Sequence, residues 1–198
     1  MNTPNKLTVL RMILVPIMLI VSLINIPGEL LGIPISWWTM DFLFVIGAIT
    51  DKIDGTLARK NNQVTNFGKF LDPIADKILV ISALIILVGH QKIPTWIPVI
   101  VIIREFAVSG YRLIAVESNG KVIAANVWGK IKTVTQMMAI IVVFLDLNAF
   151  GTFFSKHLDT IPFIINLIGT LLMTVSVIAT IFSGYEYLKG GKEMLKDR

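Results

Sequence analysis

The chain has 198 residues, of which 55% are hydrophobic and only 16% are charged, and its mean hydropathy is +0.77. Soluble domains carry roughly 25% charged residues, so this composition excludes an ordinary soluble globule and indicates a single-domain integral membrane protein over residues 1–198. Cysteine is absent, which excludes disulfides, cysteine-bound zinc and thiol catalysis. We attribute the net charge of +5 to a membrane surface rather than to nucleic-acid binding.

Hydropathy predicts six apolar segments, each near the roughly 20 residues that span a bilayer. In chain order they are Thr8–Ile26, Trp37–Arg59, Phe67–Val88, Ile93–Val116, Trp128–Leu147 and Ile161–Tyr187. Glycine, proline and asparagine residues separate the segments. We therefore expect an all-α integral membrane fold of six transmembrane helices.

The basic residues are unevenly distributed along these segments. Apart from Lys92 and Lys156, every lysine and arginine lies at the amino end, in the tail, or around the second and fourth connections with the adjoining helix ends. Since Lys and Arg accumulate on the cytoplasmic side of a membrane, we expect both termini in the cytoplasm.

The stretch DKIDGTLARKNNQVTNFGKFLDPIAD runs from Asp51 to Asp76 and puts four aspartates beside apolar segments. A carboxylate in hydrocarbon costs roughly 2.5–3.5 kcal/mol, and neighbouring carboxylates repel one another. Bound cations would offset both costs, and oxygen-only ligands suit Mg²⁺ or Mn²⁺. We therefore expect a metal site here, and two divalent ions could share its four acids: Asp51, Asp54, Asp72 and Asp76.

Helical spacing supports convergence of the four acids. Asp51 and Asp54 share one stripe of the second helix, and Asp72 and Asp76 are i,i+4 neighbours on the third. The short connection makes the two helices antiparallel neighbours. The alternative is that the acids pair with nearby lysines in a solvated loop.

Written as spacing, the stretch reads D-x2-D-G-x2-A-R-x8-G-x3-D-x3-D, which resembles the signature of the CDP-alcohol phosphotransferase family at every position. The resemblance implies a six-helix homodimeric enzyme that uses CDP-diacylglycerol and releases CMP, with Asp76 as general base. For a family member of this kind we expect the bacterial cell membrane, with the active site facing the cytoplasm. The resemblance also implies that the CDP moiety is bound by Asp51, Asp54, Gly55, Ala58, Arg59 and Gly68.

A second set of polar residues could bind a phosphate on the acceptor alcohol. The stretches REFAVSGYR and GKIKT are similar to those of family members whose acceptor is sn-glycerol 3-phosphate, in anionic phospholipid biosynthesis. The N-x2-T-x2-R spacing at the amino end also recurs in phosphatidyl-transferring members. The expected acceptor residues are Asn5, Thr8, Arg11, Arg104, Arg112, Lys130 and Lys132.

Other interpretations stay open at this stage. Asn5 and Thr8 could cap a helix, Arg104 could form a structural pair with Glu105, and the two lysines of GKIKT could anchor a helix at the interface. The acceptor could be inositol phosphate, serine or phosphatidylglycerol. In another class of protein, the aspartates would form the transport site of a cation transporter.

Overall fold

The computed structural model describes residues 3–24, 26–60, 66–117 and 127–195. Within these ranges the side chains of residues 3–5, 51–60, 66–70, 72–73, 112–117 and 190–195 are not described. The described part contains six α-helices: α1 (Thr3–Leu23), α2 (Ile35–Lys60), α3 (Asn66–Gly89), α4 (Trp96–Glu117), α5 (Val127–Leu145) and α6 (Thr160–Leu195). Two short strands, β1 (Glu29–Leu30) and β2 (Ile33–Pro34), and a 3-10 turn, η1 (Thr152–Phe154), lie in the connections.

Each predicted segment is a helix, but some helix ends differ from the prediction. The fourth helix begins at Trp96 rather than at Ile93, because the chain first turns at Gln91, which has a φ of 58°. Ile93 itself is buried in the core, so hydropathy could not separate it from the helix that follows. The β1–β2 hairpin was not predicted, since its turn uses Leu31, a residue that rarely adopts its observed φ of 56°.

Among the described residues, three helices are long and apolar enough to cross a membrane. They cover Lys6–Leu23, Val127–Leu145 and Thr160–Lys189. The apolar part of α2 is shorter, ending at Thr50, directly before the first of the four aspartates. The helical fold and the apolar spans agree with a membrane protein.

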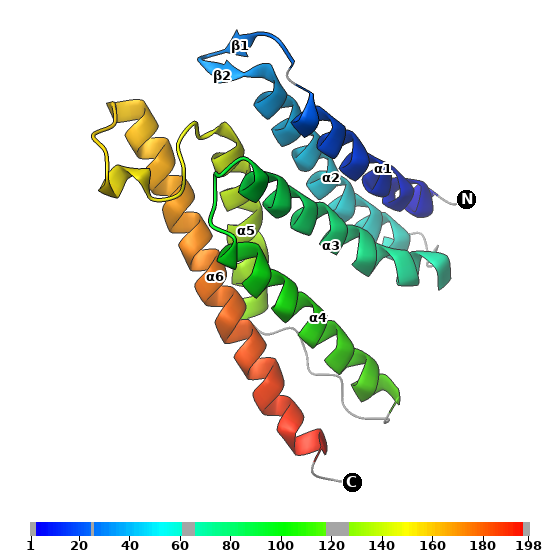
Figure 1. Cartoon of the computed structure of the whole chain (residues 1–198). Coiled ribbons are helices and arrows are strands. Elements are labelled where there is room, and N and C mark those ends of the chain that lie inside the picture. Colours follow the sequence, from blue (N-terminus) through cyan, green and yellow to red (C-terminus); the bar gives the residue numbers. More distant parts are fainter. Residues whose placement is uncertain (1–2, 25, 61–65, 118–126, 196–198) are drawn as a thin grey trace.

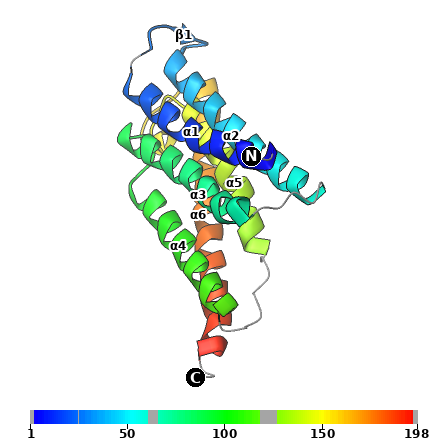
Figure 2. The same cartoon turned by 90° about the vertical axis from the view of Figure 1, so that its right-hand side faces the viewer.

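The helices form two groups, one of α1, α2 and α3 and one of α4, α5 and α6, and α5 contacts both groups. Helices α1, α2 and α3 contact one another, while α4 and α5 both pack against α6 (Figures 1 and 2). Helix α5 also contacts α2 and α3, and α4 contacts α3. A continuous core of buried apolar side chains, including Phe44, Leu84 and Phe144, fills the space between the groups.

Helices α2 and α3 approach closely at Gly47. A Cβ atom at this position would lie 2.7 Å from Cδ2 of Leu79, so any larger residue here would force the Leu79 side chain to move. Gly47 lies one turn before Asp51, and Leu79 lies about one turn after Asp76. The close approach therefore occurs next to the helical turns that carry the acids.

At the opposite end of α3, a buried polar network joins the connections. Asp146 accepts hydrogen bonds from Asn166 Nδ2 at 2.6 Å and from the Asn148 backbone N–H at 2.8 Å. Lys92 Nζ donates to the Asp146 carbonyl and lies 4.7 Å from the centroid of the Trp37 ring. Burial lowers the pKa of Lys92, and the charge of Asp146 partly opposes this shift. The network fixes the end of α5 to α6 and to the α3–α4 connection.

We expect Asp146→Ala to destabilise the protein by about 1–3 kcal/mol, because it leaves the buried amide of Asn166 without its carboxylate acceptor. Thermal unfolding in detergent measures the effect. Glu29→Ala removes an exposed acid and is the control, with little expected change. Equal stability of the two variants would contradict a structural role for the network.

Candidate functional site

The signature residues fall on the two helix ends that meet beside Gly47. The C-terminal turns of α2 carry Asp51, Asp54, Gly55, Ala58 and Arg59, and the N-terminal turns of α3 carry Gly68, Asp72 and Asp76. Of these side chains only that of Asp76 lies in the described part, and the side chains of Asn5 on α1 and Arg112 on α4 also lie outside it. Convergence of the four carboxylates thus stays a prediction.

The described side chains contain no group of three or more His, Cys, Asp or Glu residues that could hold a metal ion. The side chains of Asp51, Asp54 and Asp72 lie outside that part, so the ion site stays a prediction.

Asp76 forms an ion pair with the first helix. Arg11 Nη1 donates to Asp76 Oδ1 at 2.8 Å, and the Arg11 side chain is fully buried while that of Asp76 is 44% exposed. Thr8 lies one turn before Arg11 on α1 and is also buried. The sequence grouped Arg11 with the acceptor residues, whereas the structure pairs it with Asp76, one of the four predicted metal ligands.

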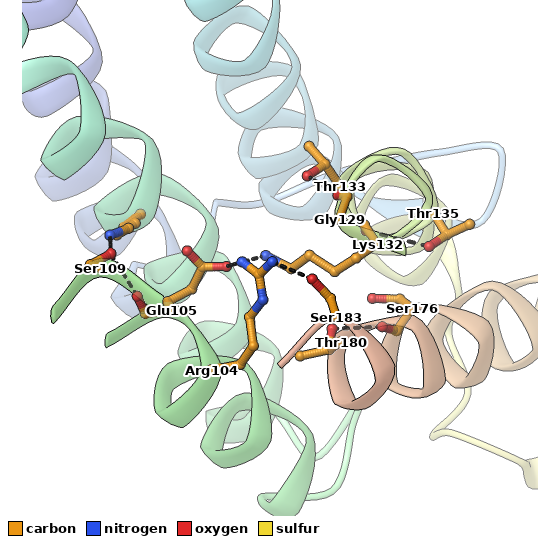
Figure 3. A network of polar contacts seen from close by, with 11 residues as sticks. Arg104, Glu105, Ser109, Gly129, Lys132, Thr133, Thr135, Ser176, Thr180 and Ser183 are labelled. Atoms are coloured by element: carbon orange, nitrogen blue, oxygen red, sulfur yellow. Dashed lines mark hydrogen bonds and ion pairs between the residues drawn. The ribbon is translucent and has the colours of Figure 1, made fainter. Parts of the chain in front are cut away.

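A second polar cluster lies where α4, α5 and α6 meet, with Glu105 at its centre (Figure 3). One oxygen of this carboxylate, Oε1, accepts hydrogen bonds from Arg104 Nη1 at 3.0 Å and from Lys132 Nζ at 2.5 Å. Arg104 Nη2 donates to Ser183 Oγ on α6. The Arg104–Glu105 pair, which the sequence left open as an alternative, is thus present, but it is part of a larger group that joins three helices.

The third helix connects the two groups of polar residues. Lys77, the residue after Asp76, donates from Nζ to Ser109 Oγ on α4. Ser109 Oγ in turn donates to the backbone carbonyl of Glu105 at 2.7 Å. One turn of α3 therefore contacts α1 through Asp76 and the α4 cluster through Lys77.

Several polar atoms in this cluster are buried without a hydrogen-bond partner. Among the described residues these include Arg104 Nε on α4 and Ser176 Oγ on α6. Buried polar groups normally have partners, and such exceptions are common where a ligand or water binds. The cluster therefore has hydrogen-bonding capacity that its own side chains do not use.

The charge of the cluster is also unbalanced. In the described part, three cations, Lys77, Arg104 and Lys132, surround one carboxylate, Glu105. Unpaired positive charge is costly inside an apolar helix bundle. An anion is the ligand that would offset this cost.

The structure separates the two lysines of the GKIKT stretch. Lys132 is buried and bound to Glu105, whereas Lys130 is exposed, so an interfacial anchoring role fits only Lys130. Sequence reasoning did not select Lys77 or Ser183. The buried hydroxyl residues of α6, at positions 176, 180 and 183, follow helical spacing and are the signal that could have indicated Ser183.

The model of the CDP-alcohol phosphatidyltransferase family matches residues 1–182, and the chain belongs to this family. It is 42% identical to CDP-diacylglycerol–glycerol-3-phosphate 3-phosphatidyltransferase of Bacillus subtilis (strain 168), with 98% of this chain and 97% of the relative covered. Proteins of the same name from Rickettsia bellii and Haemophilus influenzae are 35% and 34% identical, and both alignments cover at least 96% of each chain.

Proposed function

We propose that the chain transfers the phosphatidyl group of CDP-diacylglycerol to sn-glycerol 3-phosphate, giving phosphatidylglycerophosphate and CMP. Family membership and the full-length similarity to relatives named for this reaction support the proposal. The product, phosphatidylglycerophosphate, would be an intermediate of anionic phospholipid biosynthesis.

The observation that carries the proposal is the adjacency of Asp76 and Lys77. Asp76 belongs to the predicted acid site, and Lys77 contacts the cationic cluster around Glu105. A phosphate bound by Arg104 and Lys132 would bring the rest of a small acceptor toward Asp76. An acceptor that carries both a phosphate and a hydroxyl fits this arrangement better than a neutral alcohol.

Asp76 acts as general base in the proposed reaction. The acceptor's hydroxyl oxygen forms a bond to the phosphorus that bears the diacylglycerol, while Asp76 takes the hydroxyl proton. The bond from this phosphorus to the bridging pyrophosphate oxygen breaks, and its electron pair leaves with CMP. Arg11 holds the Asp76 carboxylate in place from α1.

The donor set on α2 and α3 fits divalent ions. Its four carboxylates are oxygen ligands for hard cations, and the close approach at Gly47 draws the two helices together beside them. Bound by Asp51, Asp54, Asp72 and Asp76, Mg²⁺ or Mn²⁺ would neutralise pyrophosphate charge. We propose that Gly55, Ala58, Arg59 and Gly68 border the CDP moiety.

We further propose that all six helices span the bacterial cell membrane, with both termini and the active site on the cytoplasmic side, and that the enzyme is a homodimer. The positions of the lysines and arginines support this orientation. The bacterial origin of the relatives supports the location.

The acceptor specificity provides the direct test of this function. Purified protein with CDP-diacylglycerol should release CMP with sn-glycerol 3-phosphate, because the cationic cluster offers a phosphate site, and far less with glycerol or serine, which carry no phosphate. Inositol phosphate also carries a phosphate, and the proposed function requires that it release less CMP than sn-glycerol 3-phosphate does. CMP release and product chromatography measure the outcome. Equal turnover with serine would contradict the proposed acceptor, and cation flux in proteoliposomes lacking CDP-lipid would favour a transporter.

Asp76→Asn should lower kcat by about 10²–10⁴-fold, the usual contribution of a general base. Asp41→Asn makes the same chemical change at a buried acid toward the other end of α2 and should retain turnover. CMP release by both folded variants is the measurement. Normal turnover of Asp76→Asn would exclude Asp76 as the base.

Removal of divalent ions should abolish CMP release, since the charge of the four aspartates and of the pyrophosphate would then be unopposed. The protein is treated with EDTA and then supplemented with Mg²⁺ or Mn²⁺, and thermal unfolding shows that it stays folded. Unchanged turnover after chelation would rule out the proposed cofactor.

A further inference from the structure

We infer that Glu105 is a positioning residue for the acceptor's phosphate, an inference that rests on the proposed function. The carboxylate does not itself bind the phosphate. It holds Arg104 and Lys132 at one point, so that their remaining N–H groups form a single anion site.

The geometry of Glu105 supports this role. A single oxygen, Oε1, receives both the guanidinium and the ammonium group, so two like charges from different helices are held beside each other (Figure 3). Two cations at this separation repel strongly in a medium of low dielectric constant. Without the Glu105 carboxylate, Arg104 and Lys132 would move apart.

Both cations keep donors that Glu105 does not occupy. A guanidinium has five N–H groups and an ammonium has three. In the described part, the Arg104 bonds go to Glu105 and Ser183, and Arg104 Nε has no partner. Lys132 bonds to the Glu105 carboxylate. The unused donors are the ones a phosphate would engage.

The charge count also matches the ligand. Among the side chains that the structure describes, and with Glu105 ionised, the three cations of the cluster leave an excess of two positive charges. A phosphate monoester carries about −1.5 to −2 at pH 7. Glu105 therefore brings the cluster close to the charge that one such phosphate neutralises, and a neutral alcohol would leave the excess uncompensated.

Steady-state kinetics of Glu105→Gln test the inference. We expect its KM for sn-glycerol 3-phosphate to rise about tenfold or more, the factor that loss of one hydrogen bond to a charged group produces. Its kcat and its KM for CDP-diacylglycerol should change less than about twofold, because the reacting groups are untouched. Asp146→Asn is the matched control, since it neutralises a buried acid at the other end of the bundle, and should leave both KM values unchanged.

A double variant separates positioning from charge balance. Glu105→Gln combined with Lys77→Met restores the excess of two positive charges among the described residues and keeps both Arg104 and Lys132, so thermal stability should recover. The KM for the acceptor should stay high, because Arg104 and Lys132 are still not held together. Recovery of the acceptor KM in the double variant, or a normal KM in Glu105→Gln, would overturn the inference. The double variant also gives the answer if Glu105→Gln alone does not fold.

Binding without turnover distinguishes failure of the inference from failure of the proposed function. Inorganic phosphate and sn-glycerol 3-phosphate should each raise the unfolding temperature of the wild type, and of Asp146→Asn, but not of Glu105→Gln. Phosphate binding without CMP release would overturn the proposed reaction and leave the anion site standing. Equal stabilisation of Glu105→Gln would overturn the inference alone.

Discussion

Charged groups inside an apolar helix bundle are stable only where opposite charges or hydrogen bonds meet them. In this protein the buried cations Arg11 and Lys132 each contact a carboxylate on another helix, and the partly buried Arg104 contacts the carboxylate of its neighbour Glu105 and Ser183 on α6. These contacts link α1 to α3, and α4 to α5 and α6. The apolar core fills the space that the ion pairs leave.

Helix α3 has a central place in this arrangement because its polar turn serves two neighbours at once. Asp76 faces α1 and Lys77 contacts Ser109 of α4, so a shift of α3 would disturb the acid site and the cationic cluster together. Gly47 adds a steric condition, because a larger residue there would displace the Leu79 side chain of α3. Binding of donor and acceptor would therefore depend on one rigid element.

Much of the fold followed from composition, since six apolar runs of suitable length predict six helices. Hydropathy misplaced the start of the fourth helix, because Ile93 is buried without being helical. It also missed the β1–β2 hairpin, because the turn uses Leu31, a residue that is unusual at a positive φ. For the site, the REFAVSGYR and GKIKT stretches identified Arg104 and Lys132, but contacts between helices, such as Arg11 with Asp76, depend on packing that a local sequence pattern does not encode. The same limit explains why Lys130 and Lys132 looked alike in sequence.

The Arg11–Asp76 pair has a consequence for biogenesis. Arg11 emerges from the ribosome 65 residues before Asp76, which lies in a different helix. Until α3 has been inserted, this ion pair cannot form, and a long basic side chain near a helix end can meanwhile stay solvated at the edge of the bilayer. The first helix therefore completes its contact with the third only after the third has arrived, which orders this step in the assembly of the nascent chain.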